Sequence, residues 1–327
     1  MKVRTKRNRV WKLLIICVSV VLVIAFTLVV IYQRDIRTAH RNVAERSKLV
    51  ETPYGCIEYG ETGEGPPVLI LHGAGGGYDQ GLLLGQIFLG DNVHVIAPSR
   101  FGYLRSEQPQ DSTLEAQADI LAALLDELGL ERVAVMAISA GGPSSLYFAR
   151  RHPERTAALI MANAISYTIP LAEEDIKKMD LIHRVIYSDF SFWIMLKTLR
   201  KPMLNLLGVP NEVLGNLSRK DQTFVDQTLE LMLPISSRIP GMLLDESRQI
   251  PPDFAYEQIT VPTLVLHARD DILVPVEQGL NAGNRIPRAE MVVFAKGGHF
   301  MIGKTEELQM TISEFFKTYL TDPYTEQ

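Results

Sequence analysis

The stretch Val135-Met136-Ala137-Ile138-Ser139-Ala140-Gly141-Gly142 joins a short apolar run to the start of a helical pattern. A serine at such a sharp strand-to-helix turn is held in a strained backbone conformation that raises its hydroxyl above the end of a sheet. The turn has room only for small side chains two positions before and after the serine, and Ala137 and Gly141 meet this requirement. The first amides of the following helix would favour negative charge at the same point. We therefore predict that Ser139 is a nucleophile, against the alternative of a small-residue contact between a strand and a helix.

Short β-rich runs and amphipathic helices alternate on both sides of this stretch, which is typical of a parallel α/β sheet. Residues 114–128, for example, carry apolar side chains at helical spacing. The alternation stops between about 166 and 250, where helical runs dominate. Because this segment lies between two predicted strands, we expect it to be an inserted helical cap. The predicted strands are residues 68–71, 93–97, 133–137, 157–161, 263–267 and 291–294.

A serine hydroxyl is a weak nucleophile at neutral pH, so a general base is needed. His299 follows the last predicted strand in the loop Gly297-Gly298-His299-Phe300, whose glycines let the chain bring the imidazole inward. His267 lies inside a predicted strand and His152 precedes Pro153, so structural roles suit both of these histidines. We predict that His299 is the base.

The imidazole needs a carboxylate to fix its tautomer and to stabilise its protonated form. Two carboxylates follow the strand predicted at 263–267, in the loop Arg269-Asp270-Asp271-Ile272-Leu273-Val274-Pro275. We favour Asp271, with its neighbour Asp270 as the chief rival. Without the serine and the histidine, both would be equally well explained as solvated loop residues.

A glycine-rich loop, Leu71-His72-Gly73-Ala74-Gly75-Gly76-Gly77-Tyr78, follows the first predicted strand of the alternating pattern. Its glycines allow backbone amides to face a ligand. In acyl transfer, the amides of Ala74 and Ala140 would bind the oxyanion of the tetrahedral intermediate. A dinucleotide-binding fingerprint is the competing interpretation, but Tyr78 occupies the place of its third glycine.

The order Ser…Asp…His, the turn around Ser139 and the His-Gly loop resemble the α/β-hydrolase superfamily in its serine-nucleophile branch. The resemblance covers about residues 50–165 and 255–320, and the loop at 98–106 resembles the loop after the fourth strand of that family. Ala137 stands where the family more often has glycine. The resemblance implies a mostly parallel eight-stranded sheet flanked by helices, with the active site at the carboxyl ends of the strands.

The activity implied by this resemblance is that of a serine hydrolase cleaving a carboxylic ester or a related acyl bond of a small molecule. An acyltransferase, a C–C bond hydrolase, a peptidase or a non-catalytic binding protein would share the same core and remain alternatives. Neither motif requires a metal or an organic cofactor. The apolar residues of the cap, at 190–196 and 203–207, either bury the cap against the core or line an acyl pocket or touch a bilayer.

Residues 13–32 form a run of 20 residues without a charge, about 30 Å long as a helix and thus able to span a bilayer. The positive-inside rule keeps the N-terminus in the cytoplasm and sends the rest of the chain across. A cleaved export signal is the alternative, but no small-residue cleavage site follows Val30. The cationic side chains ahead of the run are those of Lys2, Arg4, Lys6, Arg7, Arg9 and Lys12.

We therefore expect a single-pass membrane protein with a tail, transmembrane helix and short stalk in residues 1–45 and a hydrolase domain in residues 46–327. The net charge of −5 gives no reason to expect a nucleic-acid partner. Cys17 and Cys56 are too few for a disulfide framework.

Overall fold

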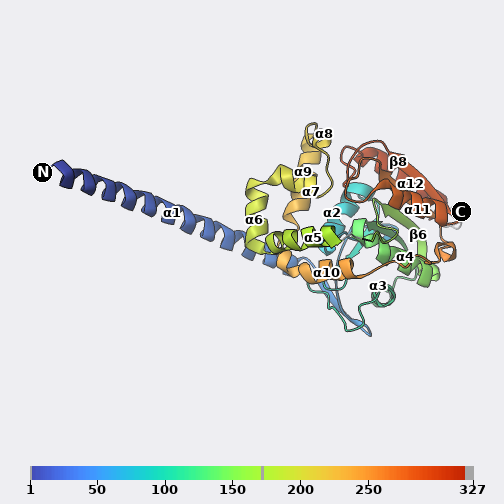
Figure 1. Ribbon diagram of the computed structural model, residues 1–327. Helices are drawn as coiled ribbons and strands as arrows, with labels where there is room; N and C mark the ends of the chain where they lie inside the picture. The colour runs from blue at the N-terminus through green and yellow to red at the C-terminus, as the bar shows by residue number, and fades with distance from the viewer. Residues whose placement is uncertain (1, 171–172, 321–327) are drawn as a thin grey trace.

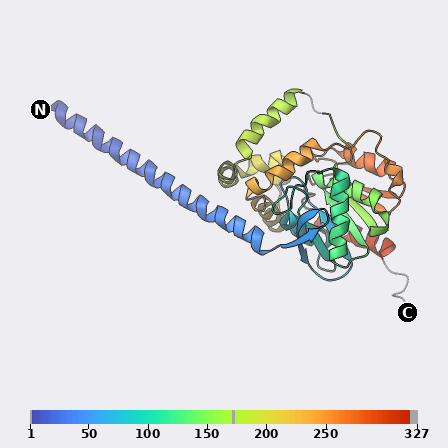
Figure 2. The ribbon, with the colours of Figure 1, turned by 90° about the horizontal axis from the view of Figure 1, so that it is seen from below.

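The computed structural model describes residues 2–170 and 173–320, and a single eight-stranded sheet lies at its centre (Figures 1 and 2). The strands lie in the order β1-β2-β4-β3-β5-β6-β7-β8. Strand β2 runs antiparallel to both of its neighbours, and the remaining pairs are parallel. The mostly parallel eight-stranded sheet predicted from the sequence is thus confirmed. The strands are β1 (Lys48–Thr52), β2 (Gly55–Thr62), β3 (Pro67–Leu71), β4 (His94–Pro98), β5 (Val133–Ile138), β6 (Thr156–Ala162), β7 (Thr263–Ala268) and β8 (Ala289–Phe294).

Helices cover both faces of the sheet, as the burial of its parallel strands requires. Alternate residues of each strand enter opposite cores: Val68 and Ile70 belong to one core, and Leu69 and Leu71 to the other. Helices α2 (Tyr78–Leu89) and α12 (Thr305–Tyr319) pack together on the first face. The second face carries α3 (Leu114–Glu127), α4 (Gly142–Arg151) and α11 (Val276–Arg285).

The segment between β6 and β7 is helical, and its described residues contain no strand. Since β6 and β7 are neighbours in the sheet, this segment leaves and re-enters the core at one place. Ser188 caps α6 with its side chain, and Ser218 caps α9 in a capping box with Asp221. The helices of the segment are α5 (Glu173–Ile186), α6 (Asp189–Thr198), α7 (Arg200–Leu206), α8 (Asn211–Leu214), α9 (Arg219–Glu230) and α10 (Ile239–Ser247).

The proposed division of the chain at residue 45, and the limits of the cap at about 166 and 250, remain predictions. Residues 1, 171–172 and 321–327, which fall within these divisions, lie outside the described residues. The short polar stalk expected after the apolar run is a continuation of the N-terminal helix, α1 (Lys2–Glu45).

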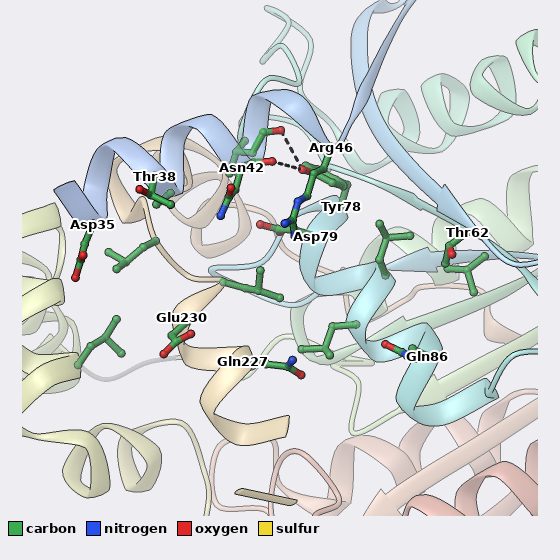
Figure 3. Close-up of a pocket in the computed structure, with 18 of the residues that line it drawn as sticks. Asp35, Thr38, Asn42, Arg46, Thr62, Tyr78, Asp79, Gln86, Gln227 and Glu230 are labelled. Atoms are coloured by element: carbon green, nitrogen blue, oxygen red, sulfur yellow. Dashed lines mark hydrogen bonds between the residues drawn. The ribbon is translucent and has the colours of Figure 1, made fainter. Parts of the chain in front are cut away.

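Helix α1 extends away from the rest of the structure (Figures 1 and 2). All side chains described from Trp11 to Val30 are exposed, so the apolar surface of α1 has no partner among the residues that the structure describes. Its last turns are bound to the core and the cap. The Tyr78 hydroxyl donates to the carbonyl oxygens of Asn42 and Val43, at 3.2 and 2.9 Å. These two bonds lie beside a hollow of about 930 Å³ between α1, α2, α6 and α9 (Figure 3).

A buried ion pair joins the cap to the core. The Arg100 guanidinium, in the loop after β4, donates to both carboxylate oxygens of Asp245 on α10, at 2.5 and 2.7 Å. The Tyr103 hydroxyl donates to the same carboxylate at 2.6 Å. Burial alone would lower the pKa of Arg100, but Asp245 outweighs it and raises that pKa above its ordinary value. Arg100 therefore stays charged, and its hydrogen bonds to Asp245 fix α10 to the loop after β4.

Replacing Arg100 with methionine will leave the Asp245 carboxylate buried without its cation. We expect a loss of about 3–5 kcal/mol in the free energy of unfolding. The double variant Arg100→Met/Asp245→Leu should recover most of this loss, because the carboxylate that pairs with Arg100 is removed as well. Thermal and urea unfolding of the detergent-solubilised chain measure both effects. The control is Arg151→Met, which breaks the exposed pair with Asp119 and should cost less than about 1 kcal/mol.

Candidate active site

Ser139 occupies the turn between β5 and α4 with a φ of 54°, in the left-handed region that side chains other than glycine rarely adopt. The Ser139 amide donates to the Asn163 carbonyl at 3.1 Å, and the Ile165 amide donates to the Ser139 carbonyl at 2.9 Å. Gly141 and Gly142 allow this close approach. A Cβ on Gly141 would lie 2.2 Å from the Leu71 carbonyl oxygen, and a Cβ on Gly142 would lie 2.0 Å from the Ile165 carbonyl oxygen. The strained turn predicted for Ser139 is therefore present.

The glycine-rich loop after β3 lies directly against this serine. A Cβ on Gly73 would be 2.9 Å from Ser139 Cβ and 3.4 Å from its Oγ. Gly73, Ala74 and Ser139 all line one cavity. Ala140 is the second residue of the single 3₁₀ turn at Ser139–Gly141, so its amide has no partner inside that turn. The backbone of both loops can thus present amides beside the hydroxyl.

His299 and Asp271 form a buried hydrogen-bonded pair. The imidazole Nδ1 lies 2.8 Å from Asp271 Oδ2, and both side chains are almost fully buried. Asp271 Oδ1 accepts from the amides of Leu273 and Val274, each at 2.9 Å. With three donors around it, the carboxylate is held in one orientation and in turn orients the ring.

Asp270, the rival carboxylate, makes different contacts. Its oxygens accept from the amides of Gly297 and Gly298, at 3.2 and 2.9 Å. Asp270 therefore shapes the loop that carries His299, and the structure brings Asp271 to the imidazole.

Ser139 and His299 line the same cavity but, within the described residues, make no direct hydrogen bond with one another. Hydrogen bonds of this kind are often long without substrate and tighten when it binds. The site thus contains the Ser139 hydroxyl and the His299 imidazole in one cavity, and the Asp271 carboxylate is bonded to that imidazole. Gly73 and Ala74 line the same cavity.

The cavity has a volume of about 250 Å³ and mostly apolar walls. One polar group in its lining comes from α5, the residue after α5 and α10: Glu246 Oε1 lies 3.1 Å from His183 Nε2 and accepts from the Tyr187 hydroxyl at 3.0 Å. No lysine or arginine is among the described residues that line it. Its apolar lining consists of side chains from α2, β5 and the cap, namely Leu84, Ile138, Met179, Ile182, Ile186, Phe192, Met195, Met203, Leu206, Leu207, Met232 and Met242, together with Leu273 and Phe300.

Two further histidines have structural contacts. His72 is fully buried: its Nδ1 bonds the Gly73 carbonyl at 2.7 Å, and its Nε2 accepts from the Arg100 amide at 3.1 Å. Burial, with Arg100 adding to it, lowers the pKa of His72 well below its usual value, so the ring stays neutral. His267 Nε2 bonds the Val274 carbonyl at 2.9 Å, and burial lowers its pKa as well. Within the described parts of the chain, no group of three or more His, Cys, Asp and Glu side chains is placed to hold a metal ion.

Comparison with known proteins agrees with this geometry. The family model for the alpha/beta hydrolase fold matches residues 66–185. An alpha/beta hydrolase fold protein from Nakamurella multipartita superimposes with a TM-score of 0.68 and 25% identity, covering 82% of this chain and 98% of that protein. The chain belongs to the α/β-hydrolase superfamily.

Curated relatives of this α/β hydrolase are hydrolases themselves. A 2-hydroxymuconate semialdehyde hydrolase of Pseudomonas putida is 27% identical over 256 residues, which are 73% of this chain and 83% of the relative. A 2-hydroxy-6-oxo-6-phenylhexa-2,4-dienoate hydrolase of Comamonas testosteroni is 28% identical over 255 residues, 75% of this chain and 85% of the relative. These relatives support an enzymatic role as a hydrolase.

Asn163 is a residue of the hydrolase that the sequence analysis missed. It follows β6 directly, with a φ of 43°. Its side-chain nitrogen donates to the carbonyls of Gly298 and His299, at 3.0 and 2.7 Å, and its side-chain oxygen accepts from the Ala268 amide at 2.8 Å. One buried amide thus connects the turn of Ser139 to the loop of His299. The signal in the sequence would have been an asparagine, a residue that tolerates the left-handed conformation, directly after a predicted central strand.

Gly208 is a second residue that was missed. It lies in the cap after α7, and its carbonyl accepts from the His299 amide at 3.0 Å. A Cβ at this position would lie 2.8 Å from both His299 Cβ and Leu273 Cβ. The cap therefore touches the histidine loop itself.

Replacing Asn163 with alanine will release the His299 loop from β6. Because a displacement of about 1 Å can cost on the order of 100-fold in rate, we expect the kcat for nitrophenyl esters to fall by about 10- to 100-fold, with little change in KM. Gln117→Ala is the control. It removes another buried amide, which accepts from the Phe101 amide, and should lower stability while leaving kcat within about twofold. Equal loss of kcat in both variants would contradict a positioning role for Asn163.

Proposed function

We propose that this α/β hydrolase cleaves carboxylic esters with an apolar acyl part through an acyl-serine intermediate. One observation carries this proposal: Ser139 and His299, which is paired with Asp271, line a cavity whose walls are mostly apolar and whose described lining has no lysine or arginine. The residue roles that follow are those predicted from the sequence.

In the first step His299 Nε2 takes the proton of the Ser139 hydroxyl as the serine attacks the ester carbonyl. The negative charge that develops on the carbonyl oxygen is stabilised by the amides of Ala74 and Ala140. His299 then protonates the leaving alcohol and later removes a proton from water, which attacks the acyl-serine. Asp271 stays ionised throughout and stabilises the imidazolium.

The charge of the cavity favours esters over carboxylated dienoates. The names of the curated relatives denote substrates with carboxylate groups, such as a dienoate. Burying a carboxylate without a cation is costly, and here Glu246 would add repulsion. Cleavage of a carbon–carbon bond in such a compound is the second candidate, and its support is the relationship itself. Transfer of the acyl group to an acceptor other than water, or cleavage of a peptide, would use the same residues.

The apolar run in α1 supports the further proposal that the chain is anchored in a membrane by residues 13–32. The run is long enough to cross a bilayer, and nothing else in the described chain covers it. The cationic residues before the run support an orientation with the N-terminus in the cytoplasm and the hydrolase domain on the other side.

The assignment of the nucleophile predicts that Ser139→Ala will abolish labelling by a fluorophosphonate probe, with an unchanged unfolding temperature. Asp271→Asn should lower kcat by about 10⁴-fold, because the amide favours the wrong tautomer of the imidazole. Asp270→Asn is the matched control and should cost less than about 100-fold, since it disturbs only the loop. Labelling that persists in Ser139→Ala would refute the proposed chemistry, and a larger loss in Asp270→Asn would reverse the choice of carboxylate.

The cavity predicts a preference for longer acyl chains. Each methylene that it buries contributes about 0.8 kcal/mol, so kcat/KM for nitrophenyl esters should rise about tenfold for every two methylenes until the cavity is full. A panel from acetate to decanoate, together with a carboxylated dienoate, measures this preference. A profile that is flat beyond acetate, or a higher kcat/KM for the dienoate, would favour the second candidate.

A further inference from the structure

The aromatic contacts of α1 mark where its apolar run meets the cap. Tyr32, the last residue of the uncharged run, has its ring 5.2 Å from that of Phe190 and 5.6 Å from that of Trp193, both on α6. The indole nitrogen of Trp193 donates to Asp35 at 3.1 Å. Tyrosine and tryptophan are enriched at the boundary between hydrocarbon and water. If α1 spans the bilayer, α6 therefore lies at the level of the bilayer surface.

Helix α5 continues this surface. It packs against α6, and both helices lie on the side of the molecule from which α1 projects (Figures 1 and 2). The outward side chains of α5 include Leu181, which is 66% exposed, and Val185, one turn further on and 49% exposed. Lys177 and Arg184 are exposed on the same helix. Exposed apolar side chains flanked by cations are typical of helices that lie in the surface of a membrane with anionic lipids.

The other side of α5 forms a wall of the active-site cavity, to which Met179, His183 and Ile186 contribute. Ile182 belongs to both surfaces, since it lines the cavity and is also 38% exposed. Leu206 on α7 likewise lines the cavity and is 48% exposed. An apolar route thus leads from the outer surface of α5 into the cavity that contains Ser139.

We propose that the outer face of α5 and α6 lies in the surface of the bilayer, and that the substrate is a lipid-like ester which enters the cavity from the membrane beside α5. This proposal rests on the proposed ester hydrolysis and membrane anchor, and adds to them a substrate class and a route. The bilayer is the occupant that the structure favours, because the aromatic end of the apolar run, the exposed leucine and valine, and the cations lie on one side of the molecule.

The catalytic test uses the full chain in phosphatidylcholine vesicles that contain some phosphatidylglycerol. Two substrates are compared: a long-chain fluorogenic ester held in the bilayer, and water-soluble nitrophenyl acetate. The variant Leu181→Gln/Val185→Gln should lower turnover of the bilayer ester by about tenfold and leave acetate hydrolysis within about twofold. The matched control is Leu280→Gln/Met310→Gln, which makes the same change at exposed positions of α11 and α12. Unchanged turnover of the bilayer ester, or equal loss on both substrates, would overturn the route.

A second measurement does not depend on catalysis. A bimane label on Leu181→Cys, in a Cys17→Ser background, should be quenched by lipids that carry a spin label near the head group, whereas the same label on Met310→Cys should not. Absence of quenching at both positions would overturn the membrane face. Self-quenching between two labelled copies instead would assign the face to a second copy of this chain. If neither ester is hydrolysed and no probe labels Ser139 while the bimane is quenched, the proposed function fails and the membrane face stands.

Discussion

The backbone and side-chain hydrogen bonds of one buried asparagine hold the two halves of the candidate site together. Asn163 ends the strand that lies between the nucleophile strand β5 and the strand β7 that leads to Asp271. Its backbone carbonyl accepts from the Ser139 amide, and its side chain is bonded to Gly298 and His299 in the histidine loop and to Ala268 at the end of β7. A buried amide that lost these partners would carry the full cost of its desolvation. Because of this, the serine and the histidine cannot be displaced independently.

The cap makes direct hydrogen bonds to the loops that carry the candidate site. The Gly208 carbonyl accepts from the His299 amide. The Arg100–Asp245 pair fixes α10 to the loop after β4, and the Arg100 amide of that loop also donates to His72. The apolar walls of the cavity come mainly from cap helices, whereas its reactive groups come from the ends of the core strands. In the proposed function, substrate choice is thus assigned to the cap and chemistry to the ends of the core strands.

Much of the core could be predicted from the sequence because buried parallel strands give continuous apolar runs. All six predicted strands are present, with ends that differ by one or two residues. Strands β1 and β2 were not located from the sequence. In β2, charged residues and glycines interrupt the apolar pattern of Gly55–Thr62. Its Glu58 is buried, and this burial depends on hydrogen bonds from side chains far away in the sequence. Ser139, Asp271 and His299 could be proposed from the sequence because their loops have distinctive chemistry, and the structure brings the Asp271 carboxylate to the His299 imidazole. Asn163 and Gly208 were missed because their roles depend on contacts between segments far apart in the chain.

Helix α1 has no break between its apolar run and the core, and its last turns are bound to Tyr78 and, through Asp35, to Trp193. The 13 residues from Gln33 to Glu45 span about 20 Å as a helix. A helix of this length is too stiff to serve as a flexible hinge between the apolar run and the core. With α1 in a bilayer as proposed, the hydrolase domain cannot tilt without tilting the helix, so its remaining motions are rotation about the helix axis and lateral diffusion. Encounter with an amphiphile then becomes a search in two dimensions, governed by the surface density of the substrate rather than by its concentration in solution.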